Sequence, residues 1–431
     1  MTHHTPHARV TRRTFLTTAT AAAGLALATP ALPAAGETSH QARPFRTALS
    51  VSPFTEAVLA RTPLTDGIRT ARTAEAVQRL FVAHGATEVY ARIATRRVAV
   101  DNDAQHGLDR GLERARLARR LGLPFNPELG LWAVYGDIAY QPEPDFSDYP
   151  GITLPGPWTS LTIEQMLPIL YRYGVTVAAK ILATGATVRV WDLGNEIEFG
   201  MAGVAIRSLV TQTADWTYSP PDAVDPAIGQ MDFATLFTLS ETDRIAWLRT
   251  HLWPHVGRML AATAAGIRTV QPGARFSSHT STIGAASPNL SVAFWQAMRA
   301  AGYQASELGT SFYPTSNDHG DRLALFKDVT TTLSSTFGKP VFVAELGYPS
   351  AAMSAPYPWN SALPGYPISP QGEHDFVRDV VAWGAGDGPL SGVRPWAPDY
   401  CVGGWQPMSH FTSSGVAEPV IDAIAEGLLL A

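Results

Sequence analysis

The sequence predicts an α/β fold, a single (β/α)8 TIM barrel, and two observations favour it. Segments with helical periodicity and segments with strand periodicity alternate eight times along the 431 residues. No Ser/Gly linker, charge block or tandem repeat divides the chain. Strands that alternate with helices form a parallel sheet, and eight such units close into a barrel. A doubly wound open sheet is the alternative, which the lack of a Gly-rich phosphate loop after any strand disfavours.

The first half of the barrel is predicted from four strands and the helices between them. Each helix carries apolar residues on one face and ends at a glycine, and the third begins with the capping box Thr162-Ile-Glu-Gln165. Each following strand is a short apolar run rich in β-branched residues. The predicted strands are 47–52, 88–93, 123–131 and 188–196, and the predicted helices are 73–85, 108–122 and 162–185.

The second half repeats the same alternation. One helix is recognised by apolar residues on one face, namely Ile245, Leu248, Leu252 and Val256. Two further helices are predicted at 292–302 and 323–338, and a last one begins at Ser369-Pro370, a favourable helix start. The predicted strands are 275–279, 308–313, 339–345 and 394–396.

Two connections are longer than the others. Residues 132–160 follow strand three, and residues 197–240, which are rich in Trp, Tyr and Pro, follow strand four. Long loops at the carboxyl ends of barrel strands usually build the substrate cleft. We therefore expect these two loops to border the functional site.

The first 35 residues have the layout of a twin-arginine signal peptide. Thr11-Arg-Arg-Thr-Phe-Leu16 precedes an Ala/Leu run that ends near Leu27, and small residues follow from 31 to 36. The apolar run is too short to span a bilayer comfortably, which disfavours a membrane anchor. The expected organisation is a signal peptide at 1–35 and one (β/α)8 barrel domain at 36–431. The expected location is extracellular, periplasmic or on the cell surface.

Charge and cysteine content exclude several classes of function. The formal net charge is −5, and loss of the signal segment, which holds three arginines and no acid, makes the chain more acidic. Such a chain lacks the basic stripe that holds nucleic acid or anionic lipid. The single cysteine, Cys401, excludes an internal disulfide framework and a cysteine metal cluster. We expect no cofactor, no metal, no membrane span after signal cleavage, and a monomer.

Two glutamates are the leading candidates for chemistry. Glu196 is the last residue of Val188-Arg-Val-Trp-Asp-Leu-Gly-Asn-Glu196, and Glu345 is the last residue of Lys339-Pro-Val-Phe-Val-Ala-Glu345. A carboxylate at the end of a buried strand is costly unless it has a partner or a role. In a barrel, the two lie at the carboxyl ends of strands four and seven, on the face where barrel enzymes react. A pair of facing carboxyl groups is the arrangement that cleaves glycosidic bonds.

Neighbouring residues indicate different roles for the two acids. Asn195 precedes Glu196 and offers an amide to a sugar hydroxyl. Tyr313 ends the sixth strand, beside the seventh, where its hydroxyl can donate a hydrogen bond to Glu345 and favour the ionised carboxylate. Glu196 is then the acid/base and Glu345 the nucleophile. A single glutamate at a strand end is more often solvated or ion-paired, so the prediction depends on the joint placement of both.

Further candidates each have a functional and a structural interpretation. Arg92, at the end of strand two, anchors a carboxylate or forms an ordinary ion pair at the rim of the barrel. His279 contacts the substrate or the acids, or is a structural histidine. Trp396, at the end of strand eight, presents its ring to a sugar. Packing is the expected role of four other tryptophans, Trp132, Trp158, Trp216 and Trp405.

The chain resembles the clan of retaining (β/α)8 glycosidases, and the spacing of its motifs is most similar to that of glycoside hydrolase family 53, the arabinogalactan endo-β-1,4-galactanases. Shared features are Tyr-Pro after strand six, Lys-Pro before strand seven and Tyr-Pro after the nucleophile. The motifs are Gly194-Asn-Glu196, Thr310-Ser-Phe-Tyr-Pro314, Lys339 to Glu345 with Leu-Gly-Tyr-Pro349 after it, Trp396, and Gly403-Gly-Trp-Gln-Pro-Met-Ser-His-Phe411. The resemblance extends loosely over residues 46–427.

This resemblance implies roles for individual residues. Glu196 is implied as proton donor, Glu345 as nucleophile, Asn195 as the contact for a sugar hydroxyl and Tyr313 as the partner of the nucleophile. Arg92 and Trp396 are implied among the residues that bind substrate.

The chain departs from the family after strand three. There the galactanases carry a motif of the His-Tyr-Ser-Asp type, whereas this chain has Asn126-Pro-Glu-Leu-Gly-Leu-Trp-Ala-Val-Tyr-Gly-Asp137. We expect an exported retaining glycosidase of the endo-β-1,4-galactanase type that acts on a polysaccharide or oligosaccharide. Another clan member, such as a β-mannanase, β-glucanase or exo-β-glycosidase, and a barrel that binds carbohydrate without cleaving it are the alternatives.

Overall fold

The structure is a computed structural model that describes residues 44–212, 216–282, 286–318, 320–355 and 357–431. The predicted signal peptide, residues 1–35, lies outside these ranges. Within them, no helix is both long enough and apolar enough to cross a membrane.

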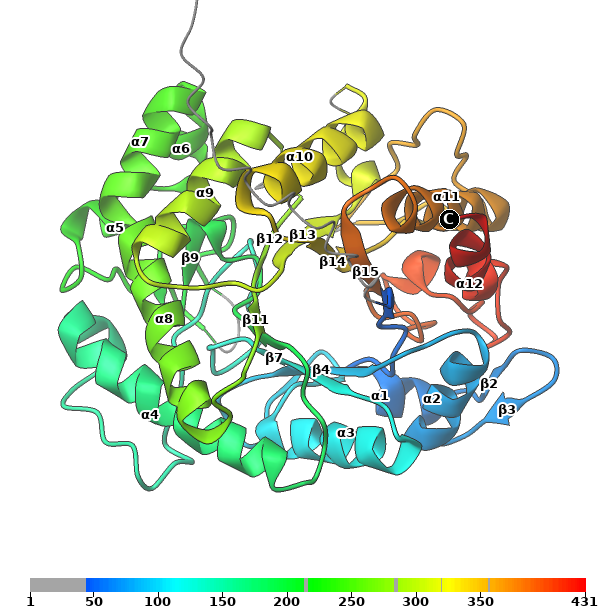
Figure 1. The fold of residues 1–431 in the computed structure, drawn as a ribbon, viewed down its shortest axis with the longest axis horizontal. Coiled ribbons are helices and arrows are strands. Elements are labelled where there is room, and N and C mark those ends of the chain that lie inside the picture. Colours follow the sequence, from blue (N-terminus) through cyan, green and yellow to red (C-terminus); the bar gives the residue numbers. More distant parts are fainter. Residues whose placement is uncertain (1–43, 213–215, 283–285, 319, 356) are drawn as a thin grey trace, which may run out of the picture. The chain divides into compact units, whose positions relative to one another are not determined.

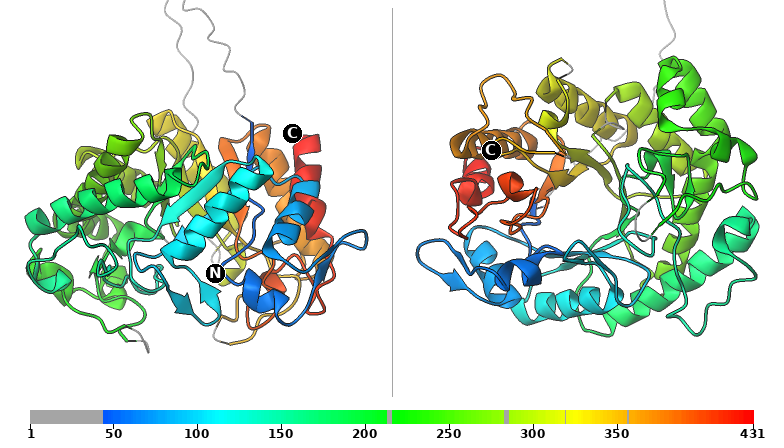
Figure 2. Two further views of the ribbon diagram at one scale, coloured as in Figure 1. Left: turned by 90° about the horizontal axis from the view of Figure 1, so that it is seen from below. Right: turned by 180° about the vertical axis from the view of Figure 1, so that it is seen from behind.

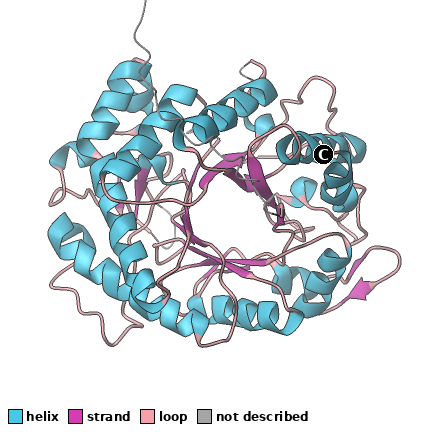
Figure 3. Cartoon of the chain, viewed as in Figure 1, coloured by secondary structure: helices cyan, strands magenta, loops and turns pink. Residues whose placement is uncertain are grey.

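The predicted strands form a ring of parallel β-strands with helices around it (Figures 1 and 3). Hydrogen-bonded strands follow the chain order, and the first strand lies beside the last. A doubly wound sheet would place its first strand inside the sheet, so the barrel prediction is confirmed. In chain order the strands are β1 (Arg46–Thr47), β4 (Val89–Ile93), β7 (Phe125–Leu129), β8 (Trp191–Leu193), β11 (Phe276–Ser277) with β12 (His279–Thr280), β13 (Leu308–Phe312), β14 (Val341–Leu346) and β15 (Leu390–Pro395).

Two junctions connect the two halves of the ring. At strand five the ladder is interrupted at Ser278, where β11 pairs with β8 and β12 pairs with β13. The Ser278 carbonyl still accepts a hydrogen bond from the Gly309 N–H at 2.8 Å. Between β1 and β4, the Thr87 N–H donates to the Thr47 carbonyl at 2.9 Å. These contacts bring all eight carboxyl ends to one face.

Helices cover the outside of the ring, as Figure 2 shows from two further directions. The predicted capping box of Thr162 and Gln165 is present, and Gly122 and Gly338 end their helices in the left-handed conformation at φ 69° and 61°. The last helix packs against the one before it (Figure 1). The surrounding helices are α2 (Ala74–Ala83), α3 (Leu108–Leu121), α4 (Ile163–Leu182), α8 (Trp253–Val270), α9 (Pro288–Ala300), α10 (Arg322–Phe337), α11 (Pro370–Ala385) and α12 (Val420–Leu430).

One predicted helix is wrong in its extent. The face that runs from Ile245 to Val256 belongs to two helices, α7 (Glu241–His251) and α8, which meet at Leu252. Pro254 explains the break, because a proline has no N–H for the helical ladder but fits the first turn of a new helix.

Short elements complete the loops. After strand four the chain forms η2 (Ile197–Phe199), the hairpin of β9 (Gly200–Met201) and β10 (Val204–Ala205), α5 (Pro226–Gln230) and α6 (Phe233–Thr238). The segment after strand three is irregular up to η1 (Trp158–Ser160). The remaining elements are α1 (Thr55–Leu59), β2 (Leu64–Thr65), β3 (Thr70–Ala71), β5 (Val100–Asp101), β6 (Ala104–Gln105), η3 (Pro314–Ser316) and η4 (Gln406–Met408).

Candidate active site

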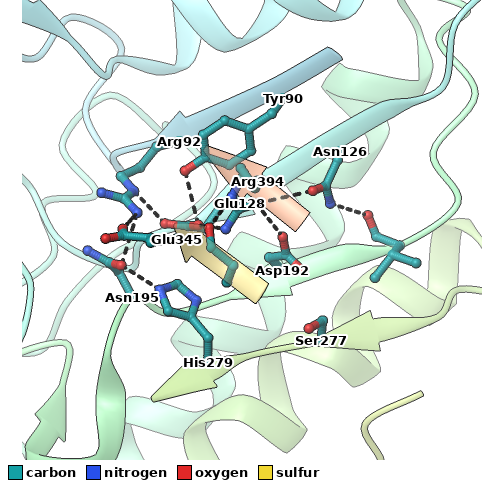
Figure 4. Close-up of polar contacts among 12 residues, drawn as sticks. Tyr90, Arg92, Asn126, Glu128, Asp192, Asn195, Ser277, His279, Glu345 and Arg394 are labelled. Carbon is teal, nitrogen blue, oxygen red and sulfur yellow. Dashed lines mark hydrogen bonds and ion pairs between the residues drawn. The ribbon is translucent and has the colours of Figure 1, made fainter. Parts of the chain in front are cut away.

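Polar side chains from six barrel strands meet at the carboxyl face and in the interior just below it (Figure 4). Most are buried, and hydrogen bonds and ion pairs connect them into one network. The residues shown in Figure 4 include Tyr90 and Arg92 from β4, Asn126 and Glu128 from β7, Asp192 from β8 with Asn195 just after it, His279 from β12, Glu345 from β14, and Arg394 from β15.

Glu345 lies on β14 with 5% of its surface exposed. One carboxylate oxygen, Oε1, accepts a hydrogen bond from the Arg92 guanidinium. The other, Oε2, accepts a hydrogen bond from the Tyr313 hydroxyl at 2.7 Å. Both contacts agree with the sequence predictions for Arg92 and Tyr313. The carboxylate is therefore held in one orientation by donors on both sides.

Arg92 has several partners that fix its guanidinium plane. Its Nε donates to Glu128 Oε1 at 2.5 Å, and its Nη2 donates to Asn195 Oδ1 at 3.0 Å as well as to Glu345. The guanidinium carbon lies 4.6 Å from the centroid of the Trp396 ring. Multiple fixed donors of this kind make arginine suited to orienting carboxylates.

A second buried arginine lies deeper in the barrel. Arg394 donates to Glu128 Oε2 at 2.6 Å and to Asp192 Oδ2 at 2.9 Å, and the Tyr90 hydroxyl donates to Glu128 Oε2 at 3.0 Å. Glu128 thus accepts from both arginines. It was not among the residues predicted from the sequence, although a glutamate inside an apolar parallel strand is a detectable signal.

Glu196 follows β8 in an unusual backbone conformation. Its φ of 50° and ψ of 61° are left-handed, which costs about 1–3 kcal/mol for a residue other than glycine. Two positions earlier, Gly194 has a φ of 77°, and a Cβ there would lie 2.4 Å from Ile197 Cγ2. Glycine is therefore required in the turn that brings Glu196 to the site.

The Glu196 carboxyl group is buried, with 7% of the residue exposed. Burial, followed by the negative charges of Glu345 and Asp137, raises its pKa well above the usual range. The pKa of Asp137 is itself raised, to about 6, mainly by burial and further by the charge of Glu345. Glu196 Oε2 accepts a hydrogen bond from the Ile138 N–H at 3.2 Å. The surroundings of Glu196 therefore favour its protonated form, whereas Glu345 is oriented by two hydrogen-bond donors.

Asn195 is fully buried, and its side chain is already hydrogen-bonded. Its amide oxygen accepts from Arg92 and lies 2.8 Å from His279 Nε2, while its Nδ2 donates to the Gly136 carbonyl at 2.8 Å. Burial lowers the pKa of His279 to about 3, so the ring is neutral and Nε2–H is the donor. His279 therefore contacts the neighbour of Glu196, and its contact with a substrate stays a prediction.

Trp396 lies at the rim of the ring, where β15 ends. Its ring stacks near that of Tyr135, with centroids 6.4 Å apart and planes 29° apart, and meets the edge of Phe54. The Tyr135 hydroxyl accepts a hydrogen bond from Arg92 Nη1 at 3.3 Å. Tyr135 and Asp137 were not predicted as site residues. The signals for them were the length of the loop after strand three and the departure of residues 126–137 from the family motif.

The other tryptophans are placed partly as expected. Trp132 and Trp158 are buried and pack in the interior. Trp405 lies in a half-buried aromatic group, 6.3 Å from the Tyr313 ring centroid and 5.2 Å from that of Trp359. Trp359 comes from residues 347–369 after β14, a long connection that was not predicted.

The sequence profile of glycosyl hydrolase family 53 matches residues 143–418, more than half of the chain. This chain belongs to that family. The matched range of the family 53 profile includes both Glu196 and Glu345. The match begins after residues 126–137, the segment in which the sequence was predicted to depart from the family.

Individual relatives agree with the family 53 assignment. An arabinogalactan endo-β-1,4-galactanase of Thermothelomyces thermophilus is 22% identical over 313 residues, covering 72% of this chain and 76% of that protein. A fungal β-1,4-galactanase structure superposes with a TM-score of 0.63 at 17% identity, covering 88% of this chain and 98% of the other. The family 53 catalytic domain of Ignisphaera aggregans gives 0.58 at 15% identity, covering 89% and 99%. The fold is that of these glycosidases, and the protein is a glycoside hydrolase.

Proposed function

We propose that this family 53 member is a retaining endo-β-1,4-galactanase in which Glu345 is the nucleophile and Glu196 the acid/base. The observation that carries the proposal is the unequal setting of the two glutamates. Glu345 accepts hydrogen bonds from Arg92 and Tyr313, whereas burial and like charges raise the pKa of Glu196. The galactan substrate is inferred from the names of the relatives.

In the first step, the Glu345 carboxylate attacks the anomeric carbon of the sugar. The bond from that carbon to the leaving oxygen breaks, and Glu196 transfers its proton to the oxygen. The Ile138 N–H donates to Oε2 of Glu196, which favours Oε1 as the oxygen that carries the transferred proton. The product of this step is a glycosyl ester of Glu345.

In the second step, Glu196 acts as a base. Ester formation removes the negative charge of Glu345, which is the second largest cause of the raised pKa of Glu196. The ionised Glu196 then takes a proton from water, whose oxygen attacks the anomeric carbon and releases Glu345. The two displacements together retain the configuration at the anomeric carbon.

Activity on β-1,4-galactan and two variants test this proposal. The parent should release oligosaccharides with retained configuration, as followed by NMR of the anomeric proton, and Glu345→Ala should abolish turnover. Glu196→Ala should lose roughly 10²–10⁴-fold on galactan and far less on an activated aryl glycoside, which needs no protonation. Near-parental turnover by Glu345→Ala would remove the assignment. Cleavage of β-mannan or β-glucan in place of galactan would contradict the galactan assignment. The protein would then be a glycosidase of the same clan with another substrate.

Export by the twin-arginine route is part of the proposed function. The signal is Arg12 and Arg13 followed by a short apolar run and small residues. Replacing both arginines by lysine should retain the protein, with its signal segment uncleaved, in the cells that make it. Immunoblots of cell and culture fractions measure this. Equal secretion of the parent and the double variant would contradict the route.

A further inference from the structure

The loop after strand three contacts the backbone that carries the acid/base candidate. At the centre of this contact is Gln141, which is only 4% exposed. Its Nε2 donates to the carbonyl oxygens of Asn195 at 2.8 Å, Asp137 at 3.0 Å and Glu196 at 3.3 Å. Three carbonyl oxygens around one amide end require the nitrogen there, so the orientation of the amide is determined.

The same loop also reaches the side chains of the acid and its neighbour. The Ile138 N–H donates to Glu196 Oε2 at 3.2 Å, and the Gly136 carbonyl accepts from Asn195 Nδ2 at 2.8 Å. Gln141 therefore holds the backbone at Asn195 and Glu196, while the loop backbone holds their side chains. Glu196 has left-handed backbone angles, so its position depends on such external contacts.

We propose that Gln141 is a positioning residue for the acid/base of the hydrolysis reaction. It couples the loop after strand three to the end of β8, so that the Ile138 N–H meets Oε2 of Glu196 and Oε1 faces the leaving oxygen. This inference rests on the proposed function of Glu196. It adds a residue that touches neither the sugar nor the reacting atoms.

Loss of the Gln141 amide removes a donor from the carbonyl oxygens of Asn195 and Glu196, whereas the Asp137 carbonyl keeps the Tyr140 N–H at 3.1 Å. The loop and the Glu196 backbone then separate, and the carboxyl group loses its alignment with the leaving oxygen. A misplacement of about 1 Å can cost on the order of 10²-fold in rate. The loss concerns only the steps in which Glu196 gives or takes a proton.

The test uses Gln141→Met, which keeps a similar length without the amide, and two substrates of the glycan that the parent cleaves. One is the unmodified oligosaccharide, and the other carries a dinitrophenolate leaving group. We expect kcat/KM to fall roughly 10–100-fold on the oligosaccharide and less than about 3-fold on the aryl glycoside. Azide should raise kcat of the variant on the aryl glycoside, because this anion attacks the glycosyl ester without a base.

A matched control is available in Gln78, on α2. It is also a buried glutamine that bonds to backbone, with Nε2 donating to the Leu49 carbonyl at 3.2 Å and Oε1 accepting from the Val51 N–H at 3.1 Å. Gln78→Met should lower stability as well, but it should affect the two substrates equally and respond to azide as the parent does.

Glu196→Ala, measured on the same substrates, distinguishes a wrong role for Gln141 from a wrong acid/base assignment. If Glu196→Ala discriminates between the leaving groups and Gln141→Met does not, only the role of Gln141 is overturned. If Glu196→Ala does not discriminate either, the acid/base assignment and this inference are both overturned. Gln141→Asn, whose amide is too short to reach the carbonyls, is the second variant. If both Gln141 variants fail to fold while Gln78→Met folds, Gln141 is structural and the proposal is overturned.

Discussion

At the scale of single residues, the site is defined by the acidic side chains of Glu196, Glu345 and Asp137, whose charges interact. Burial and the charges of Glu345 and Asp137 raise the pKa of Glu196, and burial with the charge of Glu345 raises that of Asp137 to about 6. Arg92 and Tyr313 donate to Glu345. The difference in donors explains how two identical side chains can carry opposite roles.

Asp137→Asn should change the pH dependence of the enzyme. The substitution removes a negative charge near Glu196, so the pKa of Glu196 should fall. In the proposed mechanism Glu196 must be protonated for the first step, so activity should be lost as pH rises through its pKa. The alkaline limb of kcat/KM against pH should therefore move to lower pH.

Asp145→Asn is the control for this shift. Asp145 lies on the same loop, but it bonds to Arg96 and is not among the charges that raise the pKa of Glu196. Its substitution should leave the alkaline limb in place. An Asp137→Asn profile that coincides with that of the parent, or moves to higher pH, would contradict the role given to Asp137.

At the scale of elements, strand ends and two long loops were predictable, but the contacts that the loops make were not. Glu196, Glu345, Tyr313 and Arg92 were found because an apolar run ends at or near each of them, and parallel strands bring such ends together. Gln141 lies in an irregular segment that contacts Asn195 and Glu196 just after β8, and no periodicity in its sequence indicates those contacts.

The misassigned elements have similar causes. The face from Ile245 to Val256 continues through a proline, so its periodicity concealed the break between α7 and α8. The interruption of strand five at Ser278 lies within the predicted strand 275–279, whose sequence Arg-Phe-Ser-Ser-His gives no sign of a break. Residues 347–369 lie between a well-defined strand and a well-defined helix, and the aromatic group around Trp359 that they build depends on tertiary packing.

At the scale of the whole molecule, buried charges hold the barrel together across its interior. Arg394 on β15 donates hydrogen bonds to Glu128 on β7 and Asp192 on β8. Glu128 also accepts a hydrogen bond from Arg92 on β4. Arg92 then reaches Glu345 on β14. Each charged side chain in this buried network has a partner of opposite charge. Loss of one of them leaves its partners buried without a counter-charge.

Arg394→Met should lower the free energy of unfolding by about 3–5 kcal/mol, because Glu128 and Asp192 lose a buried counter-charge. Denaturant-induced unfolding measures the difference. Arg61→Met is the control, since Arg61 pairs with Asp103 where both side chains are more than half exposed. That variant should stay within about 1 kcal/mol of the parent. Similar values for the two variants would contradict a structural role for the interior network.

The loop after strand three brings Tyr135 against Trp396, Asp137 near Glu196, and Gln141 behind that acid. A short stretch of backbone therefore sets both the aromatic wall of the site and the strength of its acid. Exchange of this stretch, whether by evolution or by grafting from another glycosidase, would change the pKa of Glu196. It would also change the aromatic surface that Tyr135 forms beside Trp396. We therefore expect the pH range of the enzyme and its choice of glycan to change together when this loop is exchanged.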